Sequence, residues 1–166
     1  MLQLIEDVCE PGAEPLREIL APLDAPKHPH ARLLLENWRQ RELDFTIGRD
    51  IPARALGAVL RYLAVIDPVA GTDDYRVRLA GMAWLRRFGS DVTGATLSRL
   101  YEGLELEAWR RLLREAIDGG EPACRDARVL GDNGLKLHYE ILALPALASD
   151  GKTGCLMAGL FHYDWH

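Results

Sequence analysis

Apolar residues recur every three or four positions in two stretches of the chain, residues 30–43 and 104–118. The first stretch contains Ala31, Leu34, Leu35 and Trp38. The second contains Leu106, Trp109, Leu112, Leu113, Ala116 and Ile117, and Gly119-Gly120 follows it. This spacing places the apolar side chains on one face of a helix, and glycine is typical just after a helix end. The pattern predicts two amphipathic helices, of which the first needs a surface to cover its apolar stripe.

Alternation of apolar and polar residues marks a second kind of segment. Over Tyr75–Leu79, the apolar residues at the odd positions alternate with Arg76 and Arg78, as in a strand with one buried face. Similar segments bounded by turn-forming residues predict four more strands, over 60–67, 123–130, 136–144 and 155–163. The first two strands are joined by a short, turn-rich connection, as are the third and fourth, so both pairs are predicted to be antiparallel hairpins.

Shorter segments complete the pattern. Five prolines within residues 11–29 leave room only for a brief helix over Glu14–Leu20. A turn is predicted near Gly48–Pro52. A short helix is predicted between the glycines at positions 81 and 89, with a buried side formed by Met82, Leu85 and Phe88.

The order of these elements predicts a fold class. One helix precedes two strands, the helices within 81–118 follow, and three strands end the chain. This order predicts an α+β fold, with a five-stranded antiparallel sheet and helices inserted between strands 2 and 3 that cover one face. The N-terminal amphipathic helix 30–43 is expected to cover the other face or to pair with a copy of itself.

Composition and charge restrict the class of protein. The 166 residues, 48% hydrophobic and 27% charged, suit one folded domain. A net charge of −5 lacks the basic field that non-specific nucleic-acid binding needs. No apolar run approaches the roughly 18 residues of a membrane span, and the acidic N-terminus is unlike a secretory signal. Cys9, Cys124 and Cys155 form no CxxC pair, which predicts reduced thiols and a cytoplasmic protein.

Two motifs resemble the PAS family, in particular its short, mostly stand-alone bacterial members. One is Tyr75-Arg76-Val77-Arg78-Leu79-Ala80-Gly81, and the other is Phe88-Gly89-Ser90-Asp91-Val92-Thr93-Gly94. Further similarity lies over Leu33–Trp38 and Leu60–Asp67. The resemblance covers residues 30–163. It implies a single PAS-like domain over 30–166, with its core at 58–163, and an N-terminal extension over 1–29.

The resemblance implies a stand-alone sensory or signalling module without enzymatic activity. PAS domains hold a small molecule between helices and sheet and pass a change to a partner, and no output domain fits in a chain of this length. The expected pocket lies between the inserted helices and the sheet, lined by Val77, Leu79, Phe88, Leu113, Ile117, Tyr139, Ile141 and Leu160. Since most of these side chains are apolar, the expected ligand is small and largely apolar, with Tyr139 as the polar contact.

Two other functions remain open. One is a ligand-free module that forms a homodimer through helix 30–43 and scaffolds other proteins. The other, with the least support, is a small metal-dependent enzyme using His162, Asp164 and His166, which are typical metal-ligating residue types. The competing interpretation of these three residues is an exposed C-terminal tail.

The same resemblance allows two cofactors of PAS domains, haem and a photoreactive flavin, to be checked against the sequence. Haem-binding PAS domains carry an axial His on the long helix, and residues 105–118 contain no His, so haem is not expected. Flavin photosensors of the light-oxygen-voltage type need a reactive Cys on the preceding helices, and residues 82–103 contain none. The identity of any ligand therefore stays open.

Arg78 and the strand over 136–144 carry the other candidate polar groups. Arg78 is either an anion or partner contact or a bidentate structural ion pair, to Asp91 or an N-terminal acid. Lys136, His138 and Glu140 share one strand face. An acid–base pair is conceivable there, but a solvated face, or one partnered by the arginines of helix 30–43, is favoured, and no catalytic or metal site is predicted.

Overall fold

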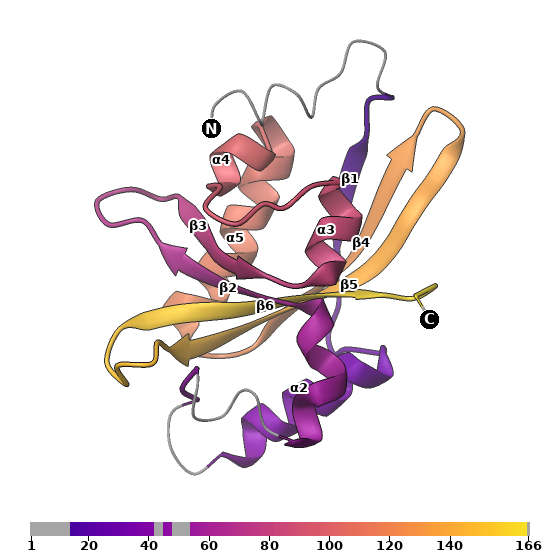
Figure 1. Ribbon diagram of the computed structural model, residues 1–166. Coiled ribbons are helices and arrows are strands. Elements are labelled where there is room, and N and C mark those ends of the chain that lie inside the picture. Colours follow the sequence, from indigo (N-terminus) through magenta and orange to yellow (C-terminus); the bar gives the residue numbers. More distant parts are fainter. Residues whose placement is uncertain (1–13, 42–44, 48–53, 166) are drawn as a thin grey trace.

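Six strands form one antiparallel sheet in the order β1-β4-β5-β6-β2-β3 (Figure 1). The computed structural model describes residues 14–41, 45–47 and 54–165, and the predicted turn near Gly48–Pro52 lies outside them. The strands are β1 (Arg17–Pro22), β2 (Leu63–Pro68), β3 (Tyr75–Ala80), β4 (Ala123–Gly131), β5 (Gly134–Leu147) and β6 (Gly154–His162). The predicted α+β class is therefore correct, but the sheet has one strand more than expected.

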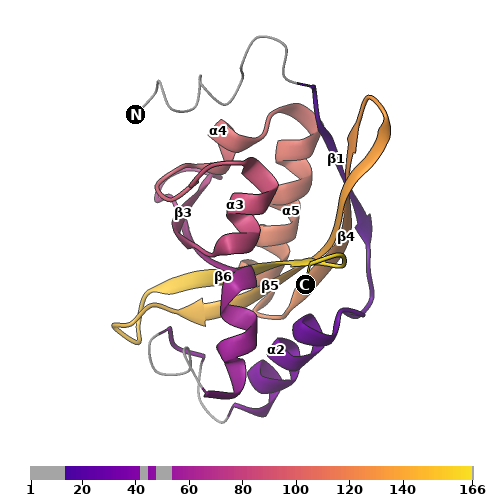
Figure 2. The same cartoon turned by 45° about the vertical axis from the view of Figure 1, so that its right-hand side comes forward.

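Helices lie on both faces of the sheet (Figure 2). Between β3 and β4, the chain forms α3 (Met82–Phe88), α4 (Leu97–Leu100) and α5 (Gly103–Gly119). Figure 2 shows α3 and α5 on one face and α2 (Pro29–Gln40) on the other, next to the 3-10 helix η1 (Arg54–Tyr62). Helix α5 buries Trp109, Leu112, Leu113 and Ala116, the middle of its predicted apolar stripe.

The apolar stripe of α2 is covered by the chain itself. Ala31, Leu34, Leu35 and Trp38 are all buried. The Trp38 indole donates a hydrogen bond to the Pro145 carbonyl on β5, at 2.9 Å. Since the stripe lies against β5, β6 and η1 of the same chain, it does not require a second copy, which removes the reason given for a homodimer through this helix.

The brief helix predicted over Glu14–Leu20 is wrong, because Arg17–Pro22 forms β1, the strand that the prediction lacked. Residues 17–22 pair antiparallel with β4, from Arg17 opposite Leu130 to Pro22 opposite Arg125. Pairing with an open sheet edge satisfies backbone groups that a one-turn helix would leave to solvent. The partner edge is more than 100 residues away, so local pattern could not reveal it.

The strand predicted over Leu60–Asp67 begins later than expected. Its first residues belong to η1, and β2 starts at Leu63. The pairing of β2 with β3 shifts register between Val65 and Ile66, which are opposite Leu79 and Val77. One extra residue on a strand reverses the faces beyond it. Leu79 is therefore 59% exposed, although Val77 is fully buried, and the predicted inward direction of Leu79 is wrong.

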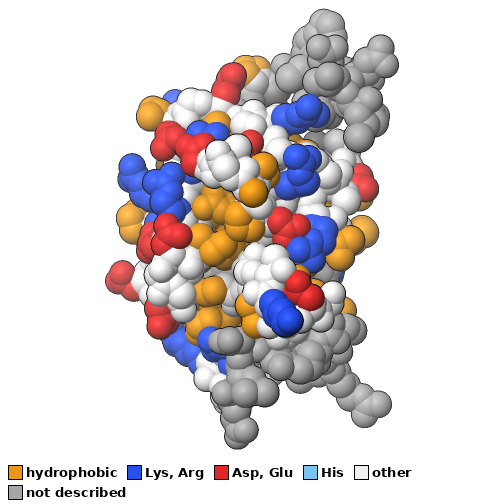
Figure 3. Space-filling view, turned by 90° about the vertical axis from the view of Figure 1, so that its left-hand side faces the viewer, with side chains coloured by type: hydrophobic (Ala, Val, Ile, Leu, Met, Phe, Trp, Pro, Cys, Tyr) orange, Lys and Arg blue, Asp and Glu red, His pale blue; other side chains and the backbone are white. Residues whose placement is uncertain are grey.

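Leu79 instead lines a shallow apolar groove of about 400 Å³ on the surface. Leu60, Val65 and Met157 also line it. In Figure 3, which faces the left-hand side of Figure 1, hydrophobic side chains gather across the middle of the surface. Exposed apolar patches of this kind are typical of sites that contact other molecules.

Helix α3 is rotated relative to the prediction. It buries Ala83 and Trp84, whereas Met82 is 60% exposed and Leu85 is also exposed. The close approach of Gly81 to η1 explains the rotation, because a Cβ at this position would lie 2.7 Å from the Arg61 carbonyl oxygen. This contact sets the start of the helix against η1 and turns Trp84 into the core.

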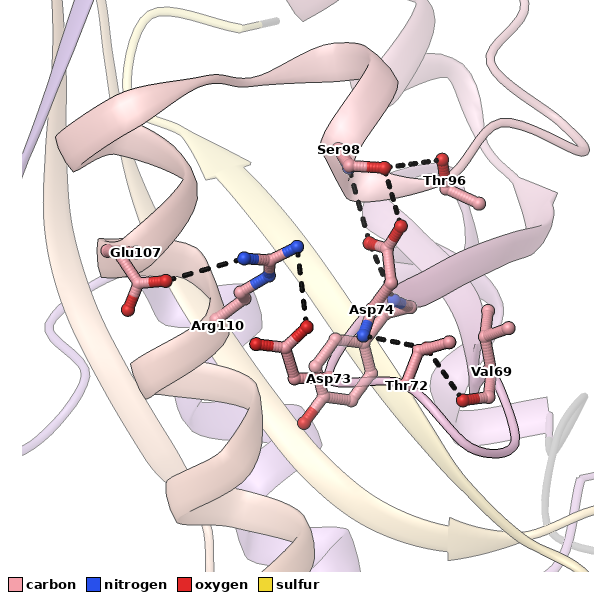
Figure 4. A network of polar contacts seen from close by, with 9 residues as sticks. Val69, Thr72, Asp73, Asp74, Thr96, Ser98, Glu107 and Arg110 are labelled. Atoms are coloured by element: carbon pink, nitrogen blue, oxygen red, sulfur yellow. Dashed lines mark hydrogen bonds and ion pairs between the residues drawn. The ribbon is translucent and has the colours of Figure 1, made fainter.

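The turn between β2 and β3 is tied to α4 and α5 by polar contacts (Figure 4). The Asp74 carboxylate accepts hydrogen bonds from the Ser98 hydroxyl at 2.5 Å and the Ser98 backbone N–H at 3.2 Å. Asp73 forms an ion pair with Arg110 of α5, at 3.6 Å. These contacts position the start of α4 and the middle of α5 relative to the turn between β2 and β3.

Candidate functional site

Aromatic rings fill the space between the sheet and the helices of the inserted segment. The ring centroids of Trp84 and Trp109 are 5.9 Å apart, those of Tyr101 and Trp109 are 5.6 Å apart, and those of Phe88 and Tyr101 are 5.7 Å apart. These separations are typical of favourable aromatic pairs. The interior is therefore densely packed, and polar groups within it are conspicuous.

The predicted pocket residues lie mostly within this interior. Five of them are fully buried: Val77, Leu113, Tyr139, Ile141 and Leu160. Phe88 and Ile117 are half-buried and pack against the same core. The structure thus brings seven of the eight together and places Leu79 on the surface.

A carboxylate lies among these apolar side chains. Glu18 extends from β1 into the space beneath α3 and α5 and is only 5% exposed. Its Oε1 accepts a hydrogen bond from Arg87 Nε at 3.0 Å, and its Oε2 accepts one from the Trp109 indole at 2.5 Å. The Glu18 backbone N–H donates to Glu105 on α5, at 3.2 Å. Glu18 therefore connects the added strand to two of the covering helices.

Arg87 is the positive partner in this cluster. Its side chain is 8% exposed, and its Nε also lies 3.1 Å from the hydroxyl of Tyr139 on β5. Its guanidinium carbon lies 4.7 Å from the centroid of the Phe88 ring. Burial by itself would lower the pKa of Arg87, but the nearby carboxylates of Glu18 and Glu105 outweigh it and raise the pKa above the ordinary value.

Tyr101 completes the cluster. Its hydroxyl is buried and has no hydrogen-bond partner within the part of the chain that the structure describes. Burial, followed by the nearby Glu18 carboxylate, raises the pKa of Tyr101 well above its ordinary value. The phenol is therefore a neutral donor next to a carboxylate.

A surface groove of about 970 Å³ adjoins the cluster. It runs between β1 and the segment from Ser98 to Ala108, and both Glu18 and Tyr101 line it. Arg87 and Trp109 reach Glu18 from the interior side. The cluster therefore lies directly beneath the groove at the β1 edge of the sheet, and the Glu18 side chain is only 1% exposed.

Sequence reasoning missed this cluster. Trp109 was predicted only as a core residue, and neither Glu18 nor Arg87 was singled out. These two residues are 69 positions apart, and no periodic pattern links them. Glu18 is one of several acidic residues in the N-terminal extension, so no local signal distinguished it.

Arg78 forms a bidentate ion pair with Asp67 of β2. The Nε to Oδ2 distance is 2.7 Å, and the second guanidinium nitrogen contacts Oδ1. Both side chains are about one-third exposed. The partner differs from the predicted Asp91, whose carboxylate instead accepts from the backbone and hydroxyl of Thr93.

Of the three C-terminal residues, His162 does not belong to an exposed tail. His162 is buried in β6, and its Nε2 donates to the Ala83 carbonyl at 3.1 Å. Burial lowers the pKa of His162 to about 4. Asp164 is exposed, and His166 lies outside the described residues. Within the described ranges, no three His, Cys, Asp or Glu side chains are grouped as metal ligands would be.

Glu140 does not lie on a solvated face either. It is fully buried and accepts hydrogen bonds from the backbone N–H groups of Lys27 and His28, at 2.8 and 2.9 Å, and from the Tyr163 hydroxyl. The expectation failed because the segment before α2 crosses this face of the sheet. His138 on the same face pairs with Asp126 at 2.7 Å.

Comparison with known proteins adds one match. A family model described as a PAS domain matches residues 26–162. No curated protein matches the chain. Among the described helices, none is long and apolar enough to cross a bilayer. The matched residues include every element from α2 to β6 and exclude β1.

Proposed function

The chain belongs to the PAS domain family of sensory and signalling modules, and from this premise we propose that it senses a small, largely apolar ligand and acts through a protein partner. The ligand binds in the groove between β1 and the segment from Ser98 to Ala108, against the buried cluster. Of the residues first assigned to the pocket, Tyr139 and Phe88 contact Arg87 directly.

One observation carries this proposal: the ion pair of Glu18 and Arg87 in an otherwise apolar interior. Removing two charges from water costs several kcal/mol per ion, and a buried pair is often no more stabilising than apolar residues of similar volume. Stability by itself is therefore a weak reason for a charged pair at this position. Convergent polar groups in an apolar pocket are typical of a ligand site.

The exposed apolar surface around Leu79 and Met82 supports the second part of the proposal, that the protein acts through a protein partner. Leu79 and Met82 are among the most exposed large apolar side chains in the described chain, and the grooves that they line share Ala80 and Gly81. Arg78 lies beside this surface and is the candidate polar contact to a partner. The alternative of a ligand-free dimer loses its main support, because α2 is already covered.

Native mass spectrometry of freshly purified protein tests the ligand. We expect an extra mass that is lost on denaturation, together with a higher Tm for the loaded protein. Ala108→Trp places a large side chain in the groove lined by Ala108 and should abolish the extra mass. Arg114→Trp, at an exposed position of the same helix, is the matched control and should retain it. A bare protein with no Tm shift against a broad metabolite panel would contradict the proposal.

A further inference from the structure

Several hydrogen-bond donors converge on one carboxylate in the cluster around Glu18. Arg87 and Trp109 donate to its two oxygens, and the unpartnered Tyr101 hydroxyl lies next to it. The donors come from α3, α5 and the segment between them, all within the family match over 26–162. The acceptor alone comes from outside that match. The part of the chain within the family match therefore supplies a set of donors, and the N-terminal extension supplies what they bind.

We propose that Arg87, Trp109 and Tyr101 form a binding site for a ligand carboxylate, that Glu18 is its resident occupant, and that a monocarboxylic acid with an apolar body displaces Glu18 and releases β1. This inference rests on the proposed function and names the ligand class of the same site. It also assigns the added strand a role as a competing occupant.

Strand β1 is suited to displacement. It lies at an edge of the sheet and pairs only with β4. Within β1, Glu18 is the only buried residue, whereas Arg17 and Ile19 are exposed. Pro22 at its end has no backbone N–H to donate. Beyond the β4 ladder, the contacts of Glu18 and the half-buried Leu20 hold this strand against the rest of the fold.

The groove beside Glu18 determines the rest of the ligand. Its volume of about 970 Å³ accommodates a small molecule. Leu16, Leu20, Leu100, Leu104 and Ala108 supply apolar lining. The other charged lining residues, Arg17 and Arg99 against Glu102 and Glu105, balance in sign. A second charge on the ligand would therefore add little to the binding free energy, which favours a monocarboxylate.

The competing explanation is that Glu18 is only a structural anchor. Chemical rescue separates the two, because Glu18→Ala leaves the donors without their acceptor and opens the site to the groove. Octanoate is the probe, and octanamide is the neutral control with the same body. Glu102→Ala removes an exposed carboxylate from the same groove but leaves Glu18 and its contacts in place, so it is the matched control variant.

In the full chain carrying Glu18→Ala, octanoate at one hundred times its Kd should raise the Tm by about 5–10 °C. Octanamide should raise it far less, and the same concentration of octanoate should leave the Tm of Glu102→Ala close to unchanged. In the wild-type protein, saturating octanoate should speed hydrogen exchange of the backbone amides of β1 that pair with β4, without affecting β2 and β3. If Glu18→Ala does not fold, the exchange measurement on the wild-type protein distinguishes a displaceable Glu18 from a purely structural anchor.

Equal responses to octanoate and octanamide, or no response to either together with unchanged exchange in β1, would overturn the inference. A co-purified ligand without an acid group would do the same and would leave the proposed sensory function intact. Absence of any bound ligand, combined with no response to octanoate, would remove both.

Discussion

Trp109 and Trp84 offer a matched test of how strongly the buried carboxylate is held. Both indoles are fully buried beneath the helices. The Trp109 nitrogen donates to Glu18 at 2.5 Å, whereas the Trp84 nitrogen has no hydrogen-bond partner among the described residues. Replacing each by Phe removes the same atoms from the core, so the loss of packing is similar in the two variants.

The expected difference comes from the hydrogen bond. A hydrogen bond to a charged group contributes about 1.5–3 kcal/mol to stability, and more is lost when the buried carboxylate keeps no replacement donor. We therefore expect Trp109→Phe to lower the free energy of unfolding by about 1.5–3 kcal/mol more than Trp84→Phe does. For a chain of this size, that difference corresponds to about 3–12 °C in Tm.

Urea unfolding followed by far-UV circular dichroism measures this difference, since each variant keeps three other tryptophans that complicate fluorescence. Combining each change with Glu18→Gln completes a double-mutant cycle. Trp109→Phe should show coupling to Glu18→Gln, and Trp84→Phe should not. Equal losses of stability, or coupling of both tryptophans to Glu18, would refute the reasoning.

Three further predictions concern residues of β6, an interior strand of the sheet. Since burial holds the pKa of His162 at about 4, below its usual 6.5, the unfolded chain protonates first and stability should fall from pH 6.5 to pH 4. His162→Gln should flatten that part of the curve. Gly159→Ala should cost about 1–3 kcal/mol, because its Cβ would lie 2.3 Å from the Phe161 ring, whereas Gly154→Ala meets no atom. Burial raises the pKa of Cys155 to about 11. In a variant whose other two cysteines are replaced by serine, Cys155 should therefore react slowly with thiol reagents at pH 8 until the protein unfolds.

Each of these has a clear contrary result. An unchanged pH profile in the His162 variant would mean that other groups dominate acid unfolding. Equal Tm values for the two glycine variants would mean that the Phe161 ring moves aside. Rapid labelling of Cys155 in the folded protein would mean that β6 opens locally.

The predicted helices and strands were most accurate where the pattern was long and periodic. The stripe over 104–118 placed α5 within a residue or two of its observed bounds, because six apolar residues define one helix face. Strands β4, β5 and β6 were likewise predicted in order. The short segments failed: α3 is rotated by the close contact of Gly81 with η1, and β3 has an extra residue at its bulge.

The candidate site was likewise predictable from the sequence only in part. Tyr139 was predicted as a polar group in an apolar interior, because strand alternation shows which residues share a face. That its hydroxyl lies next to Arg87 depends on how α3 packs against β5. The partner of Arg78 is Asp67, which the pairing of β2 with β3 brings alongside it.

By itself, the sequence determined the fold class, the long helix, the order of the strands from β2 to β6 and the resemblance to PAS domains. These depend on periodicity and on short motifs, which are local properties of the chain. Only the tertiary structure decided that the extension forms β1 and that Glu18 meets Arg87 and Trp109. The physical reason is that a backbone edge and a buried carboxylate are satisfied by whichever partner the folded chain brings near, at separations that no local pattern encodes.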